Sequence, residues 1–219
     1  MRNLAVFIRW GIFSAFVGLF VGSFSTLFAF CLRQVTAFRT ENPWLILCLP
    51  LAGVVIVFLY GLFRYKNDKG TNMVLSSIHA EAEVPFRMAP LIFISTIITH
   101  LFGGSAGREG AALQLGGSIG QQLGKLFRFD EKDQRVVVMC GMSAAFSAIF
   151  GTPIAASIFS MEVVSVGVMY YAALVPCVFS SLVASKFATH MGIGPNEFKI
   201  LHMPIFEVVP TLKKIDLAI

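Results

Sequence analysis

The sequence predicts an all-α membrane protein whose helices cross the bilayer several times, and its composition is the first reason. Of the 219 residues, 56% are hydrophobic and 13% are charged, whereas soluble domains carry about 25% charged residues. The mean hydropathy is +0.77. A soluble protein of this length needs a water-compatible surface, and this chain has few residues from which to build one.

Uncharged runs are the second reason, because each is long enough to be a membrane helix. Five runs contain no Asp, Glu, Lys or Arg: 10–32, 44–63, 88–107, 136–161 and 163–185. Glu162 alone separates the last two. A helix of about 20 apolar residues crosses the hydrocarbon core. The first run is too long for a secretory signal, and no clear cleavage site follows it.

The basic residues predict the orientation of these helices. Cytoplasmic loops carry an excess of Lys and Arg. That rule places the N-terminus and the loop 125–135 in the cytoplasm, with nine basic residues inside and four outside. The net charge of +5 therefore reflects topology, and no basic patch interleaved with aromatic residues indicates a nucleic-acid partner.

Four segments are short or interrupted by glycine. Residues 72–80 and 110–124 are apolar or uncharged but too short to span a bilayer, and the chain is broken at 103–107 and at 151–153. Irregular backbone at membrane depth is tolerated only where protein buries it or water reaches it. Paired interrupted helices are typical of transporter substrate sites. We therefore expect short re-entrant helices around a polar pathway.

The break at 103–110 has the residues of an anion site. A helix is expected to begin near Glu109 or Gly110, and the first backbone N–H groups of a helix lack intrahelical partners at its positive end. Such a start binds anions through backbone groups. Residues Gly70, Thr71 and Asn72 precede a second short segment in the same way and add a hydroxyl and an amide as donors.

Glu109 is the candidate gate. A carboxylate at membrane depth is costly and indicates function. At an anion-attracting helix start it would occupy the site as a tethered anion, and protonation would release it and couple anion movement to protons. The alternative is that Glu109 caps the helix or pairs with Arg108.

The motif GGSAGREG at 103–110, followed by GTPIAA at 151–156 and FSME at 159–162, resembles the CLC family of chloride channels and proton/anion exchangers. The resemblance implies an inverted-repeat fold and transmembrane transport of fluoride or chloride, with protons as the coupled ion. In the family, the residue matching Glu109 is the gating glutamate. The full set of candidate anion-binding residues is Gly70, Thr71, Asn72, Met73, Gly107, Arg108, Gly110 and Ala111.

Details of the motifs favour the fluoride-exporting branch of the family. The order KGTNMV at 69–74, His79 soon after it, and Ala111 in place of a proline are similar to that branch. Thr71 departs from both branches. Glu162 is followed by Val163, so the internal proton-transfer glutamate of the chloride exchangers is missing, which implies either a channel or the fluoride branch.

The resemblance covers only the first half of a CLC subunit. We expect residues 1–219 to be a single transmembrane domain of the cell membrane, with the second half absent. It would act as a homodimer or with a missing second half. The open alternative is a non-conducting half that only associates with other membrane helices.

Other chemistries lack the residues they need. The four cysteines have no metal-ligand spacing, so neither a metal nor a cofactor is expected. The glycine cluster lacks the Gly-Lys-Ser/Thr and strand of a phosphate-binding loop. No His, Asp or Glu group has catalytic spacing, so we do not expect an enzyme.

Overall fold

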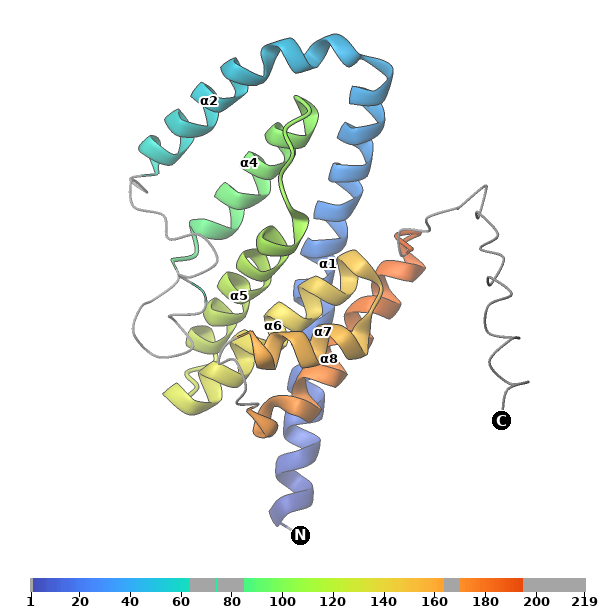
Figure 1. Ribbon diagram of the computed structural model, residues 1–219. Helices are drawn as coiled ribbons and strands as arrows, with labels where there is room; N and C mark the ends of the chain where they lie inside the picture. Colours follow the sequence, from blue (N-terminus) through green and yellow to red (C-terminus); the bar gives the residue numbers. More distant parts are fainter. Residues whose placement is uncertain (1, 64–73, 75–84, 164–169, 195–219) are drawn as a thin grey trace, which may run out of the picture.

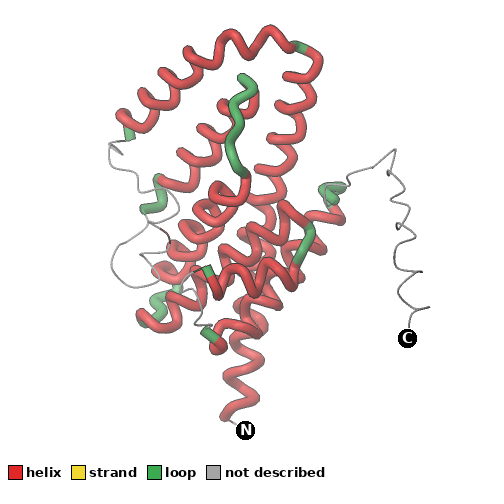
Figure 2. The backbone as a smooth tube through the Cα atoms, viewed as in Figure 1, coloured by secondary structure: helices red, strands yellow, loops and turns green. Residues whose placement is uncertain are grey.

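The structure is a computed structural model that describes residues 2–63, 74, 85–163 and 170–194, with side chains from residue 6 onward. Every regular element in these ranges is a helix, as the sequence predicts (Figures 1 and 2). The elements are α1 (Arg2–Glu41), η1 (Pro43–Cys48), α2 (Leu49–Leu62), α4 (Met88–Leu101), α5 (Arg108–Leu126), α6 (Glu131–Phe150), α7 (Pro153–Glu162), η2 (Tyr171–Ala173) and α8 (Leu174–His190).

Three helical stretches are long and apolar enough to cross a bilayer: Val6–Glu41, Pro43–Leu62 and Tyr171–His190. The outward side chains of these stretches are strongly apolar. Leu47 is 81% exposed and Val57 is 73% exposed, which water would penalise and lipid would not. The chain is therefore an integral membrane protein.

The Gly/Pro signals place most helix ends correctly. The run 136–161 divides as predicted: α6 ends at Phe150, Gly151 takes a left-handed φ of 71°, and α7 begins at Pro153. Glycine adopts such a φ readily because it has no Cβ. The first run is longer than predicted, since α1 continues past residue 32 to Glu41.

The core lies where α5 packs on α6, and glycine makes this contact close. Gly116 on α5 faces Gly141 on α6, and a Cβ on Gly116 would lie 2.6 Å from the Ala145 Cβ and 2.8 Å from the Gly141 carbonyl carbon. Small residues let membrane helices approach until their backbones touch. The relative position of α5 and α6 is therefore set by backbone atoms.

Buried serines join α6, α7 and α8. The Ser157 and Ser181 hydroxyls lie 2.8 Å apart, Ser147 donates to the Ser181 carbonyl oxygen at 2.8 Å, and Ser143 donates to the Cys177 carbonyl oxygen at 3.1 Å. Hydrogen bonds of this kind stabilise helix contacts where water is excluded.

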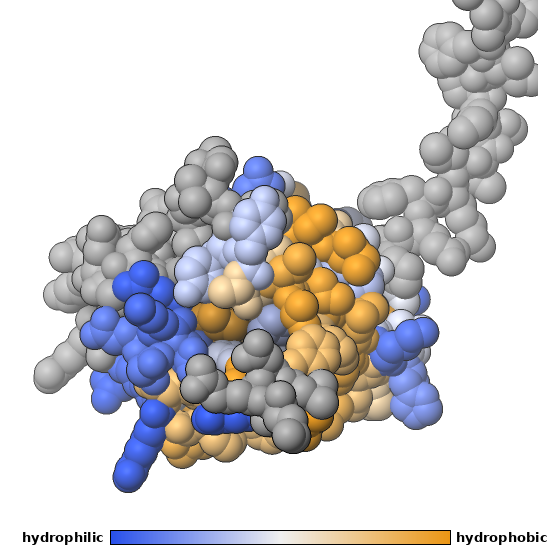
Figure 3. All heavy atoms as spheres, turned by 90° about the horizontal axis from the view of Figure 1, so that it is seen from below, coloured by the Kyte–Doolittle hydropathy of each residue, from blue (hydrophilic) through white to orange (hydrophobic). Residues whose placement is uncertain are grey.

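An aromatic cluster attaches the α5–α6 turn to α1. The Phe13 ring lies 4.7 Å from Phe129 and 5.2 Å from Phe127, and Trp10 stacks on Phe129 at 5.7 Å. In the same turn, Asp130 caps α6 by accepting from the Asp133 backbone N–H at 2.8 Å. Figure 3 views the molecule from the end at which α1 begins, and hydrophilic residues border an apolar surface there.

Candidate anion-binding site

The start of α5 lies partway along the bundle, below the level at which α4 ends (Figure 1), and its residues are exposed or half-buried up to Gly110. The chain leaves α4 at Leu101 and runs back beside it in a non-helical segment, drawn in green in Figure 2, before α5 begins at Arg108. A helix that began where α4 ends would start at the end of the bundle, whereas α5 starts partway along it (Figure 1). The predicted re-entrant helix at the glycine break is confirmed.

The first turn of α5 has no side chain capping it. Gly107 is the N-cap residue, with φ −68° and ψ 139°, and it offers no side-chain acceptor. The N–H groups of the first turn lack intrahelical partners and lie at the positive end of a helix of 19 residues. These donors are the chemical basis of an anion site at this position.

The Glu109 side chain folds back toward this helix start. One of its carboxylate oxygens, Oε2, lies 2.8 Å from the position a Cβ would occupy on Gly107. The side chain is exposed. Among the described residues, no ion pair joins Glu109 to Arg108 and no hydrogen bond holds its carboxylate. The absence of a side chain at Gly107 is what leaves room for the carboxylate.

The other candidate anion-binding residues around Glu109 differ in how deeply they are buried. Arg108 and Gly110 are half-buried beside it. Ala111 is 9% exposed and belongs to the hydrophobic core, so its methyl group packs inward and only its backbone N–H is a donor for an anion.

The second candidate segment, Gly70, Thr71, Asn72 and Met73, lies outside the described residues. Its neighbour Val74 is described and is fully buried. The Val74 Cγ1 atom packs against α5 at Gly117, in space that a side chain there would fill.

The sequence did not identify Arg39 as a residue near the site. It was counted only among the four basic residues expected on the side of the membrane opposite the cytoplasm. Arg39 lies at the end of α1, and its Nη1 atom is 3.1 Å from the position of a Cβ on Gly103. Gly103 has φ 80° and begins the segment that leads to α5. A guanidinium here raises the local potential on the approach to the helix start. No signal in the sequence relates residue 39 to residue 103, because their contact is tertiary.

Several known proteins to which this chain is similar carry chloride or fluoride in their descriptions. The family model described as voltage gated chloride channel matches residues 52–214. A chloride/fluoride channel protein of Pseudomonas syringae pv. tomato is 40% identical over 203 residues, which cover 92% of this chain and 44% of that protein. An H(+)/Cl(-) exchange transporter ClcA of Cronobacter sakazakii is 25% identical over 83% of this chain and 42% of its own length.

A solved structure has the same fold. The crystal structure of a CLC-type fluoride/proton antiporter superposes with a TM-score of 0.81 at 34% identity, over 96% of this chain and 53% of that one. The chain thus spans about half the length of the relatives it matches. Its fold, its glycine break and the family model agree, and the chain belongs to the CLC family of voltage-gated chloride channels.

Proposed function

We propose that this chain supplies one half of a pathway that carries fluoride or chloride across the cell membrane. Residues 1–219 form one transmembrane unit that corresponds to the first half of a CLC subunit. The observation that carries the proposal is the uncapped start of α5 partway along the bundle, with a carboxylate folded back toward it.

The site works by competition between two anions. The α5 N–H groups attract an anion without a full positive charge, so the ion is held weakly enough to leave again. The Glu109 carboxylate competes for the same donors. A proton neutralises that carboxylate and removes its attraction to the helix start, which opens the site and links anion movement to proton movement.

Fluoride is the favoured substrate, and chloride the second. A relative named chloride/fluoride channel protein is 40% identical over 203 residues and a fluoride/proton antiporter is 34% identical. H(+)/Cl(-) exchange transporters are 25% identical over 196 residues or 31% identical over 124. Fluoride is small and strongly hydrated, so it needs several close donors. The hydroxyl of Thr71, the amide of Asn72 and the backbone at Gly70 and Met73 are the further donors that the sequence offers.

Glu109→Gln tests the mechanism, because glutamine keeps the shape and cannot ionise. The chain is reconstituted in liposomes together with a second half, or with a second copy of itself. Fluoride and chloride efflux is followed by ion-selective electrode, and proton movement by a pH dye. We expect anion flux to persist or rise, its pH dependence to disappear, and coupled proton movement to stop.

Glu162→Gln is the matched control, since Glu162 is an exposed carboxylate at the end of α7 and should leave the pH dependence unchanged. Loss of all flux in a folded Glu109→Gln protein would refute the gate and leave Glu109 a structural residue. Absence of flux from the wild-type chain, both alone and with a second half, would favour the non-conducting association partner.

A further inference from the structure

The last turn of α1 holds the Arg39 side chain across the start of the segment that leads to α5. A Cβ on Gly103 would lie 3.1 Å from the Arg39 Nη1 atom and 3.3 Å from its Cδ atom, so the stem and the guanidinium both lie over this glycine. Ile46 of η1 packs against the same point, with its Cγ1 atom at 3.5 Å. The side chain is half-buried. Because these contacts already hold the guanidinium in place, a ligand that binds it loses little further conformational entropy.

The Arg39 guanidinium has no partner in the part of the chain that the structure describes. Neither an ion pair nor a hydrogen bond joins it to another described group. Glu41, the nearest carboxylate along α1, is exposed, and residues two apart on a helix do not face each other. Half-buried donors without a partner are unfavourable. A small anion at this point would satisfy them.

Further donors follow Arg39 along the segment toward α5. The N–H groups of Gly103 and Gly104 donate to carbonyl oxygens of α4, at 3.2 and 2.8 Å. The N–H groups of Ser105 and Gly107, in contrast, have no partner within the described ranges, and both residues are exposed. The N–H groups of the first turn of α5 come next. An anion that leaves the guanidinium therefore meets backbone donors on its way to the helix start.

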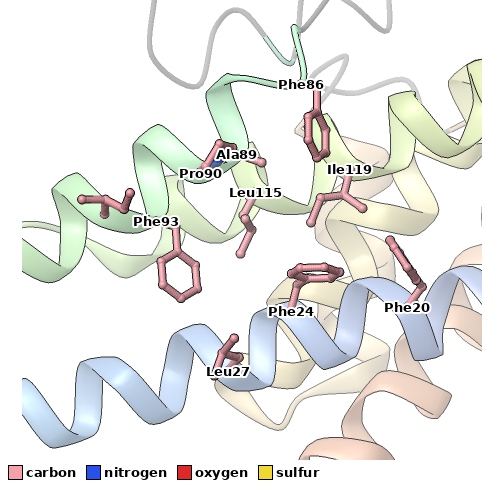
Figure 4. A pocket seen from close by; sticks show the side chains of 10 residues that line it. Phe20, Phe24, Leu27, Phe86, Ala89, Pro90, Phe93, Leu115 and Ile119 are labelled. Carbon is pink, nitrogen blue, oxygen red and sulfur yellow. The ribbon is translucent and has the colours of Figure 1, made fainter. Parts of the chain in front are cut away.

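The space between α1 and α4 offers an ion no comparable route. Away from Arg39, these two helices and α5 enclose a cavity whose lining side chains are all apolar, among them Leu27, Phe93 and Leu115 (Figure 4). An ion that enters an apolar space loses its hydration without gaining hydrogen bonds, which is costly. Within the described residues, the segment 103–107 is thus the polar connection between Arg39 and the start of α5.

We propose that Arg39 and the segment 103–107 form an outer capture site, which binds fluoride or chloride before the ion reaches the start of α5. The capture site rests on the proposed function, because it supplies the anion position at that helix start. A guanidinium about 4 Å from a small anion in water strengthens binding about fivefold. This is enough to concentrate the ion at the end of the bundle and weak enough to release it.

Chemical modification of arginine tests the capture site without transport. The full chain in detergent is treated with p-hydroxyphenylglyoxal, which reacts with exposed guanidinium groups, and peptide mass spectrometry measures the modification of each arginine. Sodium fluoride or chloride replaces sodium gluconate at constant ionic strength. We expect the halide to slow the modification of Arg39 saturably and to leave that of Arg33, an exposed residue of the same helix, unchanged. No slowing at Arg39, or equal slowing at both arginines, would overturn the proposal.

Substitutions of Arg39 separate its charge from its packing. Arg39→Met keeps an unbranched stem over Gly103 and removes the guanidinium, whereas Arg39→Lys keeps a positive charge. In liposomes with a second half, Arg39→Met should raise the KM for fluoride about fivefold and leave the maximal rate unchanged. Arg39→Lys and the matched control Arg33→Met should keep a KM near that of the wild type.

The failures of the two proposals are distinguishable. A lower maximal rate with unchanged KM in Arg39→Met would show that Arg39 only positions the segment, and would overturn the capture site. Absence of flux from the wild-type chain with a second half would refute the proposed function. The modification experiment would still decide whether an anion binds at Arg39, since it requires no flux.

Discussion

Gly116→Ala should separate α5 from α6 and destabilise the protein. The added Cβ would lie 2.6 Å from the Ala145 Cβ and 2.8 Å from the Gly141 carbonyl carbon, whereas ordinary van der Waals contact begins at 3.4 Å. The helices would have to move apart by about 1 Å, because the nearest obstacle is the backbone carbonyl oxygen of Gly141, which no rotamer change can remove.

The size of the effect follows from two opposed contributions. Overpacking of this kind costs about 1–3 kcal/mol, and Ala recovers up to about 1 kcal/mol through its higher helix propensity. A net loss of about 1 kcal/mol corresponds to a fall in melting temperature of about 2–4 °C for a chain of this length. Size-exclusion chromatography of heated, detergent-solubilised protein measures that temperature.

Gly53→Ala is the matched control. A Cβ on Gly53 of α2 would meet no atom within 4 Å, so only the propensity gain of about 1 kcal/mol remains and the melting temperature should rise slightly. If Gly116→Ala were also as stable as the wild type, the close backbone contact between α5 and α6 would not exist as described.

Three other substitutions test particular contacts by the same measurement. Asp130→Ala should cost about 1 kcal/mol, because it removes the side chain that caps α6; Asp130→Asn should retain most of the stability. Gly151→Ala should cost about 1–2 kcal/mol, since Gly151 has φ 71° and a Cβ is disfavoured there; an unchanged melting temperature would contradict the left-handed cap. Ser157→Ala should cost about 1 kcal/mol, because the buried Ser181 hydroxyl loses one of its two partners, at 2.8 Å, and keeps only the Val178 carbonyl oxygen; Ser23→Ala should cost less, since Ser23 bonds only within α1.

Most helices could be predicted because membrane helices leave strong local signals. Uncharged runs identified the apolar helices, and the Gly/Pro break at 151–153 separated α6 from α7 as the structure does. The length of α1 was underestimated, because Arg33 and Arg39 ended the uncharged run although α1 continues to Glu41. Long basic side chains near a helix end reach the interface and do not stop the helix.

The candidate site was predicted where it is contiguous in sequence. The glycine break and Glu109 stand together at 103–110, so a local pattern identified the start of α5. Its roles as gate and anion site remain predictions. The contact between Arg39 and Gly103 joins residues far apart in the chain, and no local pattern contains such contacts. The segment from Gly70 to Met73 lies outside the described residues.

The backbone contact between α5 and α6 has a consequence for how fast the proposed gate works. Because the backbones of α5 and α6 touch at Gly116 and Gly141, α5 cannot tilt or slide to open the site without losing that contact. The moving part is then the Glu109 side chain alone, which turns about its own torsion angles over an otherwise rigid helix. Exposed side chains change rotamer within nanoseconds, whereas helix displacements take microseconds or longer. Opening would therefore be limited by the arrival of a proton and show a weak dependence on temperature.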